Sequence, residues 1–519
     1  MENNMLINGA VPESQYGEKA SRTVLLGTDT AELTKEFTLP DYIPDVRKVV
    51  SSGARIRSEE TGRNDDRAGW DCTVIFEALL LCDDGTVREV SLQGNQSGEV
   101  KLDADASDLW LEFETDNPSM RATDPRKLTG RCRINVFAYG TEEVECGVDV
   151  TGKRASAEDS FEKKCETVGY TVIKHYKKDD IRASFDIELG SSEADINDIV
   201  SCKVNPYITS IRVNGTSAEL TGEAGVEIIY SDADGVYRMH RASVPINAII
   251  EDDFGNVTGA WASAETDEVK AAAQTNTYGE QKTVELDFSW NAMLLCALYE
   301  ECGIVTDIYS TADEIELKRG TVRLNMRAFS FSDRFSVKGE SSAEDLSLSK
   351  AVSIDAFTAY AKIERVSRKD GGEAEFAGCV YIRLICGTGD AEERCAAGEL
   401  RIPFVYTRRI DGNDGNFEYR ACADVCGARV KLENGRVTAD ADLCISAILW
   451  EPCSLDTVTG AEIKGAIEKK RSPFTLYYVG DEDTLWEVAK AFRVPADTIL
   501  ERNGITAEGF KGKKVIAIP

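Results

Sequence analysis

Short runs in which apolar and polar residues alternate make up most of the chain before residue 455. Examples are VEIIY, RCRINVFAY and RVTADADLCISAILW, and turn-forming stretches such as DDG, DADG and GND separate them. Alternation with a period of two, interrupted by Asp, Asn and Gly, is typical of antiparallel strands with one buried face. The pattern predicts a mainly β protein with sandwich-like domains and few helices before residue 480.

The same pattern occurs three times along the chain. DCTVIFEALLLCDDGTVREV (71–90) parallels GVEIIYSDADGVYRMH (225–240), and the turn glycines Gly85 and Gly235 are 150 positions apart. A third copy, GCVYIRLICGTGDAEE (378–393), places Gly378 153 positions after Gly225. Self-similarity at a fixed period indicates a repeat architecture. We therefore expect three tandem antiparallel units.

Shorter landmarks recur in the same order. Glu114-Thr115-Asp116 returns at 265–267, and Glu145-Cys146-Gly147 returns at 301–303. Together with composition, they predict these divisions: an N-terminal segment (1–29), a first, divergent unit (30–150), a second unit (165–305), a third unit (306–455), a linker (456–473) and a small C-terminal module (474–519). A polar stretch of this kind predicts a tether between folded parts.

Motifs within the units resemble the SPOCS domain, a family associated with spore coat and spore morphogenesis proteins of endospore-forming bacteria. The resemblance rests on LPDYIPDVRKVV, KVNPYITSIRVNGTSAELTGEAGVEIIYSDADGVY, VPINAIIEDD and EECGIVTDIYSTADEIEL. The second unit matches best, and the third keeps an echo of VPINAII in GELRIPFVYT (399–408). The first unit has SLQGNQSGEV at the equivalent place and is a divergent copy.

The last residues predict a strand, two helices and a second strand, at about 476–479, 484–492, 496–502 and 514–519. Thr484 and Glu487 have the spacing of a capping box, in which each side chain satisfies a backbone N–H of the other residue. Leu485, Val488, Ala489 and Phe492 form one apolar stripe on the first helix. Asn503-Gly504 suits the end of the second helix.

The string YYVGDEDTLWEVAKAFRVPADTILERNGI, with FKGKKVIAIP after it, resembles LysM modules. That family binds the N-acetyl groups of chitin or peptidoglycan glycans in a shallow groove between two loops. The resemblance implies a ligand-binding groove lined by these residues: Asp481, Glu482, Asp483, Thr484 and Leu485 on one side, and Asn503, Gly504, Ile505 and Phe510 on the other.

One position departs from the LysM pattern. Glu482 stands where the family usually has glycine before the Asp-Thr pair. Its Cβ and carboxylate restrict the close backbone approach that an amide-reading loop needs, which favours a protein ligand over a sugar. The three-acid loop also fits a solvated cap stabilised by the helix dipole. Trp486 is expected to pack on the side of the module, with sugar stacking as the alternative.

Repeats of the SPOCS type followed by one LysM module imply a non-catalytic sporulation adaptor. The implied partners are the stage IV spore morphogenetic ATPase or other coat proteins, with self-association of the units as a further option. The implied place is the mother-cell cytosol at the forespore surface, in agreement with a start, MENNMLINGAVPESQYGEK, that lacks the features of a signal peptide. The alternative is a peptidoglycan-binding protein anchored through the LysM module.

Charge limits the range of ligands. The formal net charge of −31 argues against nucleic acid or an anionic membrane, because phosphate binding requires a cationic surface. Nowhere do about 18 consecutive apolar residues appear, so we expect no membrane insertion. From Arg471 onward acids and bases are equal in number, which leaves the excess acid upstream.

No catalytic or metal motif emerges. The two histidines, His175 and His240, lie in strand-like runs, and Cys422 and Cys426 lack a second ligand pair for zinc. We therefore expect no cofactor, no metal and no enzyme activity. A hydrolase stays an alternative, since paired carboxylates need not be close in sequence. The 15 cysteines mostly lie in apolar runs and predict buried free thiols.

Overall fold

The computed structural model describes residues 5–7, 19–64, 66–151, 161–390, 395–410, 417–467, 475–506, 510 and 514–519. Strands make up 77% of the structure, and its two short helices both lie near the C-terminus. The mainly β class is confirmed, and so is the scarcity of helices before residue 480 in the described part of the chain. The strands form several antiparallel sheets, and β8 with β20 is the parallel pair.

The first unit spans residues 19–145 and consists of two three-stranded sheets with one shared core. The sheet orders are β2–β7–β6 and β3–β4–β5. Side chains alternate between core and solvent along each strand, as in β7, where Leu128, Cys132 and Ile134 are buried. The strands are β2 (Lys19–Thr38), β3 (Val46–Asn64), β4 (Arg67–Cys82), β5 (Val87–Lys101), β6 (Ser107–Asp124) and β7 (Lys127–Glu145).

The second unit (161–310) and the third unit (313–466) have the same arrangement. The second unit has the sheets β9–β14–β13 and β10–β11–β12, and the third has β15–β20–β19 and β16–β17–β18. Strands of the second unit are β9 (Phe161–Glu188), β10 (Asp198–Asn214), β11 (Ser217–Ser231), β12 (Tyr237–Glu251), β13 (Val257–Gln274) and β14 (Thr283–Ser310). Those of the third are β15 (Asp313–Ser342), β16 (Ser353–Lys369), β17 (Glu373–Gly387), β18 (Cys395–Arg409), β19 (Glu418–Glu433) and β20 (Arg436–Ala466).

The positions of the strands define the repeat. β4, β5 and β6 begin 150 positions before β11, β12 and β13, whereas β17 begins 156 positions after β11. The structural match of Gly378 is therefore Gly222, and the alignment with Gly225 that the sequence suggests is wrong by three positions. A Cβ would lie 2.1 Å from the carbonyl oxygen of Tyr207 at Gly222, and 2.2 Å from that of Lys362 at Gly378.

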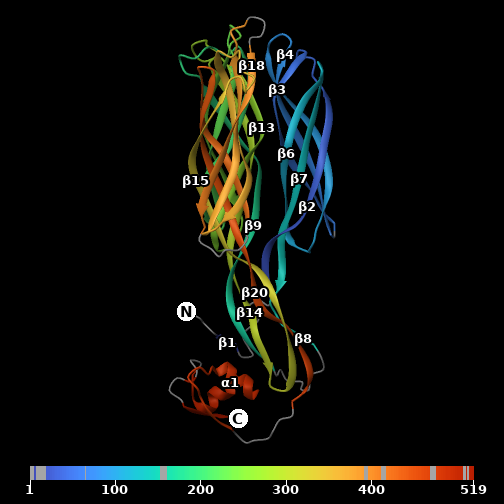
Figure 1. Ribbon diagram of the computed structural model, residues 1–519, viewed down its shortest axis with the longest axis vertical. Coiled ribbons are helices and arrows are strands. Elements are labelled where there is room, and N and C mark those ends of the chain that lie inside the picture. The colour runs from blue at the N-terminus through green and yellow to red at the C-terminus, as the bar shows by residue number, and fades with distance from the viewer. Residues whose placement is uncertain are drawn as a thin grey trace.

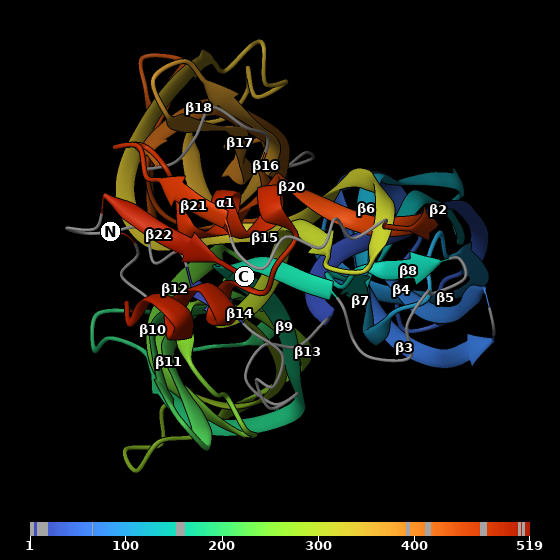
Figure 2. The same cartoon turned by 90° about the horizontal axis from the view of Figure 1, so that it is seen from below.

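The three units pack around a common axis, and Figure 2 shows them as three lobes seen along the long dimension. A buried cluster on this axis takes one side chain from the matching strand of each unit: Leu79 from β4, Ile229 from β11 and Ile385 from β17. β3, β10 and β16 contribute a second set, Val50, Val200 and Ala356. A separate cluster joins Trp110, Trp261 and Trp450 of the three units. The units thus share apolar cores as well as containing their own.

Four strands continue beyond the lobes and form a narrower stalk, which lies below the lobes in Figure 1. These strands, β9, β14, β15 and β20, are 28, 28, 30 and 31 residues long. The stalk comprises their ends (161–168, 302–310, 313–321 and 455–466) with β1 (Met5–Ile7) and β8 (Asp149–Thr151). Its core includes Val305, Ile308, Val458 and Ala461.

Two of the predicted divisions are wrong: the start of the linker belongs to the stalk, and the end of the N-terminal segment belongs to the first unit. Residues 456–466, assigned to a linker, form the end of β20 because they pair with β15 and, at 460–462, with β8, while Val458 and Ala461 enter the stalk core. Residues 19–29, assigned to the N-terminal segment, begin β2 and pair with β7. Ile467 follows β20 and donates its N–H to the Ala312 carbonyl at 2.9 Å, and residues 468–473 lie outside the described residues.

The C-terminal module follows the order strand, helix, helix, strand that the sequence predicts. Its elements are β21 (Thr475–Tyr478), α1 (Leu485–Phe492), α2 (Ala496–Asn503) and β22 (Val515–Ile518), and the two strands pair in antiparallel fashion. Its core contains Leu485, Val488, Ala489 and Ile499. Among the described residues, neither helix has the length and apolar character that crossing a membrane requires.

Candidate functional site

Most of the predicted groove residues lie in two loops of the C-terminal module, while Leu485 begins α1 and Asn503 ends α2. One loop joins β21 to α1, and the other follows α2. Asp481, Glu482, Thr484 and Gly504 are exposed, Ile505 and Phe510 are partly buried, and Leu485 belongs to the core. Phe510 packs against that core from the second loop. The first loop therefore presents two exposed carboxylates, and the nine residues are not nine free side chains.

Asp483 holds the first loop in shape. Its carboxylate accepts hydrogen bonds from the Gly480 N–H at 2.7 Å and from the Tyr477 hydroxyl at 2.9 Å. This contact raises the pKa of Tyr477, because the hydroxyl donates to a charged acceptor. Asp483 is thus already engaged inside the module.

Thr484 is the N-cap of α1, as predicted. Its hydroxyl accepts from the Glu487 N–H at 3.2 Å, and its own N–H donates to the Glu487 carboxylate at 3.2 Å. These two bonds complete the capping box and satisfy donors that a helix start leaves open. The prediction of a defined helix start at this residue is confirmed.

Asn503 joins α2 to the closing strand. Its side-chain amide donates to the carbonyls of Ile499 and Ala517, both at 2.8 Å, and its side-chain oxygen accepts from the Ala517 N–H at 2.8 Å. Gly504 follows in a left-handed conformation with φ of 56°, which favours glycine. Asn503 therefore serves the fold of the module.

Backbone donors of the two loops are also engaged. The N–H groups of Asp483, Thr484, Gly504 and Ile505 each donate to an acceptor inside the module, at 3.1–3.3 Å. A groove that reads an N-acetyl group needs backbone donors aimed outward. The exposed carboxylates of Asp481 and Glu482 are the more accessible chemistry.

The opposite side of α1 is fixed to the stalk. Asp307 on β14 accepts from the Trp486 indole at 2.9 Å and from the Lys490 ammonium at 2.6 Å. Trp486 also packs edge-on against Tyr309, with ring centroids 5.0 Å apart, and the Tyr309 hydroxyl donates to the Val494 carbonyl at 2.8 Å. Trp486 is 5% exposed, so the prediction that it packs is confirmed, although its partner is the stalk.

Asp307 is ionised at this joint. Burial opposes its charge, but hydrogen bonds from Lys490 and Trp486 outweigh that effect and lower its pKa. Local sequence patterns could not find this residue, because its partners lie about 180 positions away. The sequence does show that Trp486 and Lys490 are four positions apart on a predicted helix. This spacing places both side chains on one face, which could have indicated a contact surface there.

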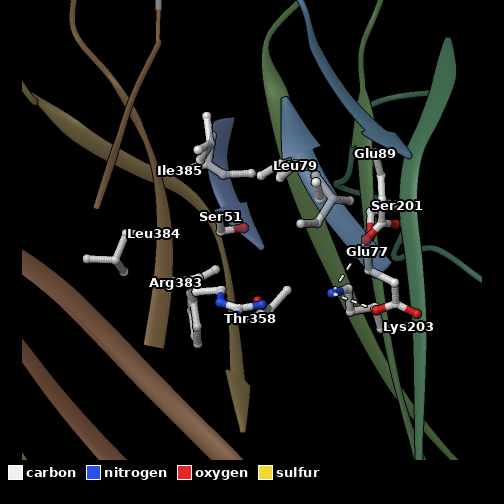
Figure 3. A pocket seen from close by; sticks show the side chains of 14 residues that line it. Ser51, Glu77, Leu79, Glu89, Ser201, Lys203, Thr358, Arg383, Leu384 and Ile385 are labelled. Atoms are coloured by element: carbon white, nitrogen blue, oxygen red, sulfur yellow. Dashed lines mark ion pairs between the residues drawn. The ribbon is translucent and has the colours of Figure 1, made fainter. Parts of the chain in front are cut away.

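A small cavity lies where the three units meet (Figure 3). Lys203 forms ion pairs there with Glu77 at 3.8 Å and with Glu89 at 3.4 Å, while Leu79 and Ile385 supply apolar walls. The cavity measures about 20 Å³, which accommodates a water molecule but no larger ligand. These charges join the units and do not form a ligand site.

A larger cavity of about 370 Å³ opens between the first and third units. Arg22 and Glu142 form an ion pair at 2.8 Å on one wall, and Arg323 and Glu418 line another. Burial raises the pKa of Glu418. The volume of this cavity falls in the range of small-molecule sites. Its walls, however, carry both positive and negative side chains without a distinct pattern.

The candidate catalytic and metal residues lie apart. His175 stacks on Trp110 with ring centroids 5.3 Å apart, and burial lowers its pKa to about 4. His240 contacts the Glu193 carboxylate at 2.9 Å. Among the described residues, no group of three or more His, Cys, Asp or Glu side chains could hold a metal ion. All 15 cysteines are free thiols.

The fold and the loops define a mainly β protein that carries a small strand and helix module at its C-terminal end. Comparison of the chain with protein-family models, with curated proteins and with solved structures gives no match.

Proposed function

We propose that this protein is a non-catalytic adaptor of spore coat assembly, composed of three SPOCS-type repeats and a LysM module. In this proposal it acts in the mother-cell cytosol at the forespore surface. The LysM module docks a protein partner, the stage IV morphogenetic ATPase or another coat protein, and the repeats bind coat components or one another. The resemblance of the sequence motifs supplies this identity.

One structural observation supports the docking role: the module is fixed to the stalk through α1 while the acidic loop between β21 and α1 remains exposed. The ion pair of Asp307 with Lys490 and the packing of Trp486 on Tyr309 orient the module. Asp481 and Glu482 lie outside this contact. A binding surface held in a fixed orientation loses less entropy on association than a tethered one.

A protein ligand is favoured over a glycan. The exposed groups of the first loop are carboxylates, which complement a basic surface. The N–H groups of Asp483, Thr484, Gly504 and Ile505 are bonded within the module, so they are not free for an N-acetyl carbonyl. Glycan binding remains the second candidate because the module has the element order of LysM proteins.

The first experiment is a pull-down from sporulating cells with the purified full chain. Glu482→Lys should reduce recovery of the morphogenetic ATPase or coat proteins by at least about tenfold, the effect of 1.4 kcal/mol. The matched control is Asp497→Lys, the same charge reversal at an exposed position of α2 outside both loops. Equal recovery with both variants would contradict the proposed surface.

A second experiment separates the two ligands. The full chain and a chain ending at residue 467 are sedimented with purified peptidoglycan sacculi. The proposal expects both to stay in the supernatant. Sedimentation of the full chain alone would establish the glycan-binding alternative instead.

A further inference from the structure

A cluster of thiols lies at the edge of the contact between the second and third units. In the sheet β15–β20–β19, Cys444 of β20 pairs with Arg334 on one side and with Asp424 on the other. Residues directly opposite in an antiparallel sheet lie on the same face. Cys444 therefore shares its face with one cation and one carboxyl group.

A β-bulge brings a second thiol to this place. The register of β19 with β20 shifts between Val425 and Gly427, so Cys426 is the extra residue. Cys426 interacts with Cys444 across this bulge, and each thiol shifts the pKa of the other. The Cys426 sulfur also lies 3.9 Å from the Asp424 carbonyl oxygen. Two thiols of one sheet are thus in contact across neighbouring strands.

The cluster is closed on one side and open on the other. On the closed side, Trp261 of the second unit belongs to a buried cluster that Cys422 packs against, and it donates to the Ser446 hydroxyl at 2.9 Å. On the β15 side, Ser332 and Arg334 are exposed, and the Ser332 hydroxyl lies 3.5 Å from the Cys444 sulfur. The Cys444 side chain is itself 5% exposed and Cys426 is partly buried, so a small reagent has to reach Cys444 past these two exposed side chains.

The surroundings of Cys444 favour its thiolate. Hydrogen bonds from Cys426, Ser332 and Arg334 lower the pKa of Cys444 to about 6, although burial opposes the charge. Burial instead raises the pKa of Cys296 and Cys386 to about 12. A thiolate beside a cation is the reactive form of cysteine.

We propose that Cys426 and Cys444 are a modification site, at which a low-molecular-weight disulfide oxidises them to a reversible disulfide bond. The Cys444 thiolate attacks one sulfur of the small disulfide, forms a mixed disulfide and releases one small thiolate. The Cys426 sulfur then attacks the Cys444 sulfur and releases the second small thiolate, which takes the Cys426 proton. Two protein thiols lose two electrons, and the small disulfide gains them.

A second thiol pair provides an internal comparison. Cys146 and Cys302 also shift each other's pKa, but each is 1% exposed and belongs to an apolar cluster at the top of the stalk. Access to the attacking sulfur is required for exchange. Cys444 is 5% exposed and Cys426 is partly buried, so we expect Cys146 and Cys302 to react more slowly than Cys426 and Cys444.

The test treats the native full chain with oxidised glutathione near neutral pH and then blocks the remaining thiols. Intact mass should show two blocking groups fewer than on the untreated chain, and non-reducing peptide mapping should join Cys426 to Cys444. A dithiol reductant should reverse both changes. An unchanged mass, a bond between other cysteines, or a stable glutathione adduct on Cys444 of the native chain would each overturn the proposal.

Variants assign the two roles. Cys444→Ser should abolish oxidation, and Cys426→Ser should retain one glutathione on Cys444, since the resolving thiol is absent. Cys386→Ser, at a buried position with a raised pKa, is the matched control and should oxidise as the native chain does. Where a serine variant fails to fold, the peptide map of the native chain still decides.

Discussion

At the scale of single residues, a few side chains fix contacts between parts of the chain that are remote in sequence. Asp307 is the clearest case, since it accepts from both Trp486 and Lys490 while its side chain is only 18% exposed. A carboxylate with two such donors is stabilised in its charged form. The C-terminal module depends on this ionised group for its attachment.

We expect Asp307→Asn to weaken the attachment of the module by about 1–3 kcal/mol, the value of hydrogen bonds to charged groups. Hydrogen exchange of α1 in the full chain measures this loss. Asp481→Asn, an exposed carboxylate outside the contact, is the control and should leave the exchange rates unchanged. Equal protection of α1 in both variants would disprove the role of Asp307.

The same contact predicts a dependence on pH. The pKa of Asp307 is lower in the folded protein than in the unfolded chain. Its carboxylate therefore stabilises the attachment of the module fully at pH values above the unfolded pKa of about 3.9. The contribution decreases as pH falls through the lowered pKa. Protection of α1 should therefore decline in acid in the native chain, and this additional decline should be absent in Asp307→Asn.

Gly222 faces a β-bulge of β10, where the register with β11 shifts between Ile208 and Ser210. Gly222→Ala should destabilise the second unit by about 1–3 kcal/mol, because the new Cβ overlaps the Tyr207 carbonyl oxygen. Gly225→Ala, on the same strand, meets its nearest atom at an ordinary 3.9 Å and should be tolerated. Denaturant-dependent hydrogen exchange of β11 compares the two. A milder effect at Gly222 than at Gly225 would reject the bulge assignment.

At the scale of elements, α1 combines two tasks on different faces. Its start carries the capping box beside the acidic loop, and its side chains Trp486 and Lys490 contact the stalk. A helix of eight residues is marginal alone, so the cap and the packed face both stabilise it. Damage to the cap should therefore reach the loop that we propose as the docking surface.

Thr484→Ala should lower the stability of the module by about 0.5–2 kcal/mol, since the side-chain acceptor of the N-cap is lost. Thr484→Ser retains the hydroxyl and is the matched control. Exchange rates at the start of α1 provide the measurement. If both variants exchange alike, the capping box does not stabilise this helix.

At the scale of the whole molecule, the three units are joined by side chains that alternate with their own cores. On β11, Ile228 belongs to the core of the second unit, whereas its neighbour Ile229 lies on the common axis. Both are almost fully buried. Because successive side chains of a strand point to opposite faces, β11 contributes to the core of its own unit and to the shared axis.

This difference predicts a contrast between neighbours. Each change to alanine should cost about 2–5 kcal/mol, because each leaves a cavity. Ile229→Ala should reduce protection from hydrogen exchange in all three units, including β4 and β17, because these strands supply Leu79 and Ile385 to the cluster. The loss from Ile228→Ala should remain in the second unit. Hydrogen exchange resolved by unit distinguishes them, and an effect of Ile229→Ala confined to β11 would contradict the shared axis.

Sequence patterns predicted what is local. The alternating strands, the shift of 150 between the first two copies and the capping box of Thr484 all rest on neighbouring residues or on the order of motifs. The end of β20 was not predicted as a strand, because its polar composition is typical of a linker. Only its pairing with β15, which the structure shows, identifies it as a strand. Asp483 and Asn503 were predicted as ligand residues, but the structure shows that hydrogen bonds from the module engage their polar atoms.

The length of the continuous strands has a mechanical consequence. β20 contains 31 residues, which at about 3.3 Å per residue span roughly 100 Å, and it runs from the far end of the third unit to the foot of the stalk. A pull on the C-terminal module acts along this strand, so the hydrogen bonds to β15 and β19 share the load in shear. The molecule is therefore suited to carry tension between a surface that holds its C-terminal module and material attached to its lobes.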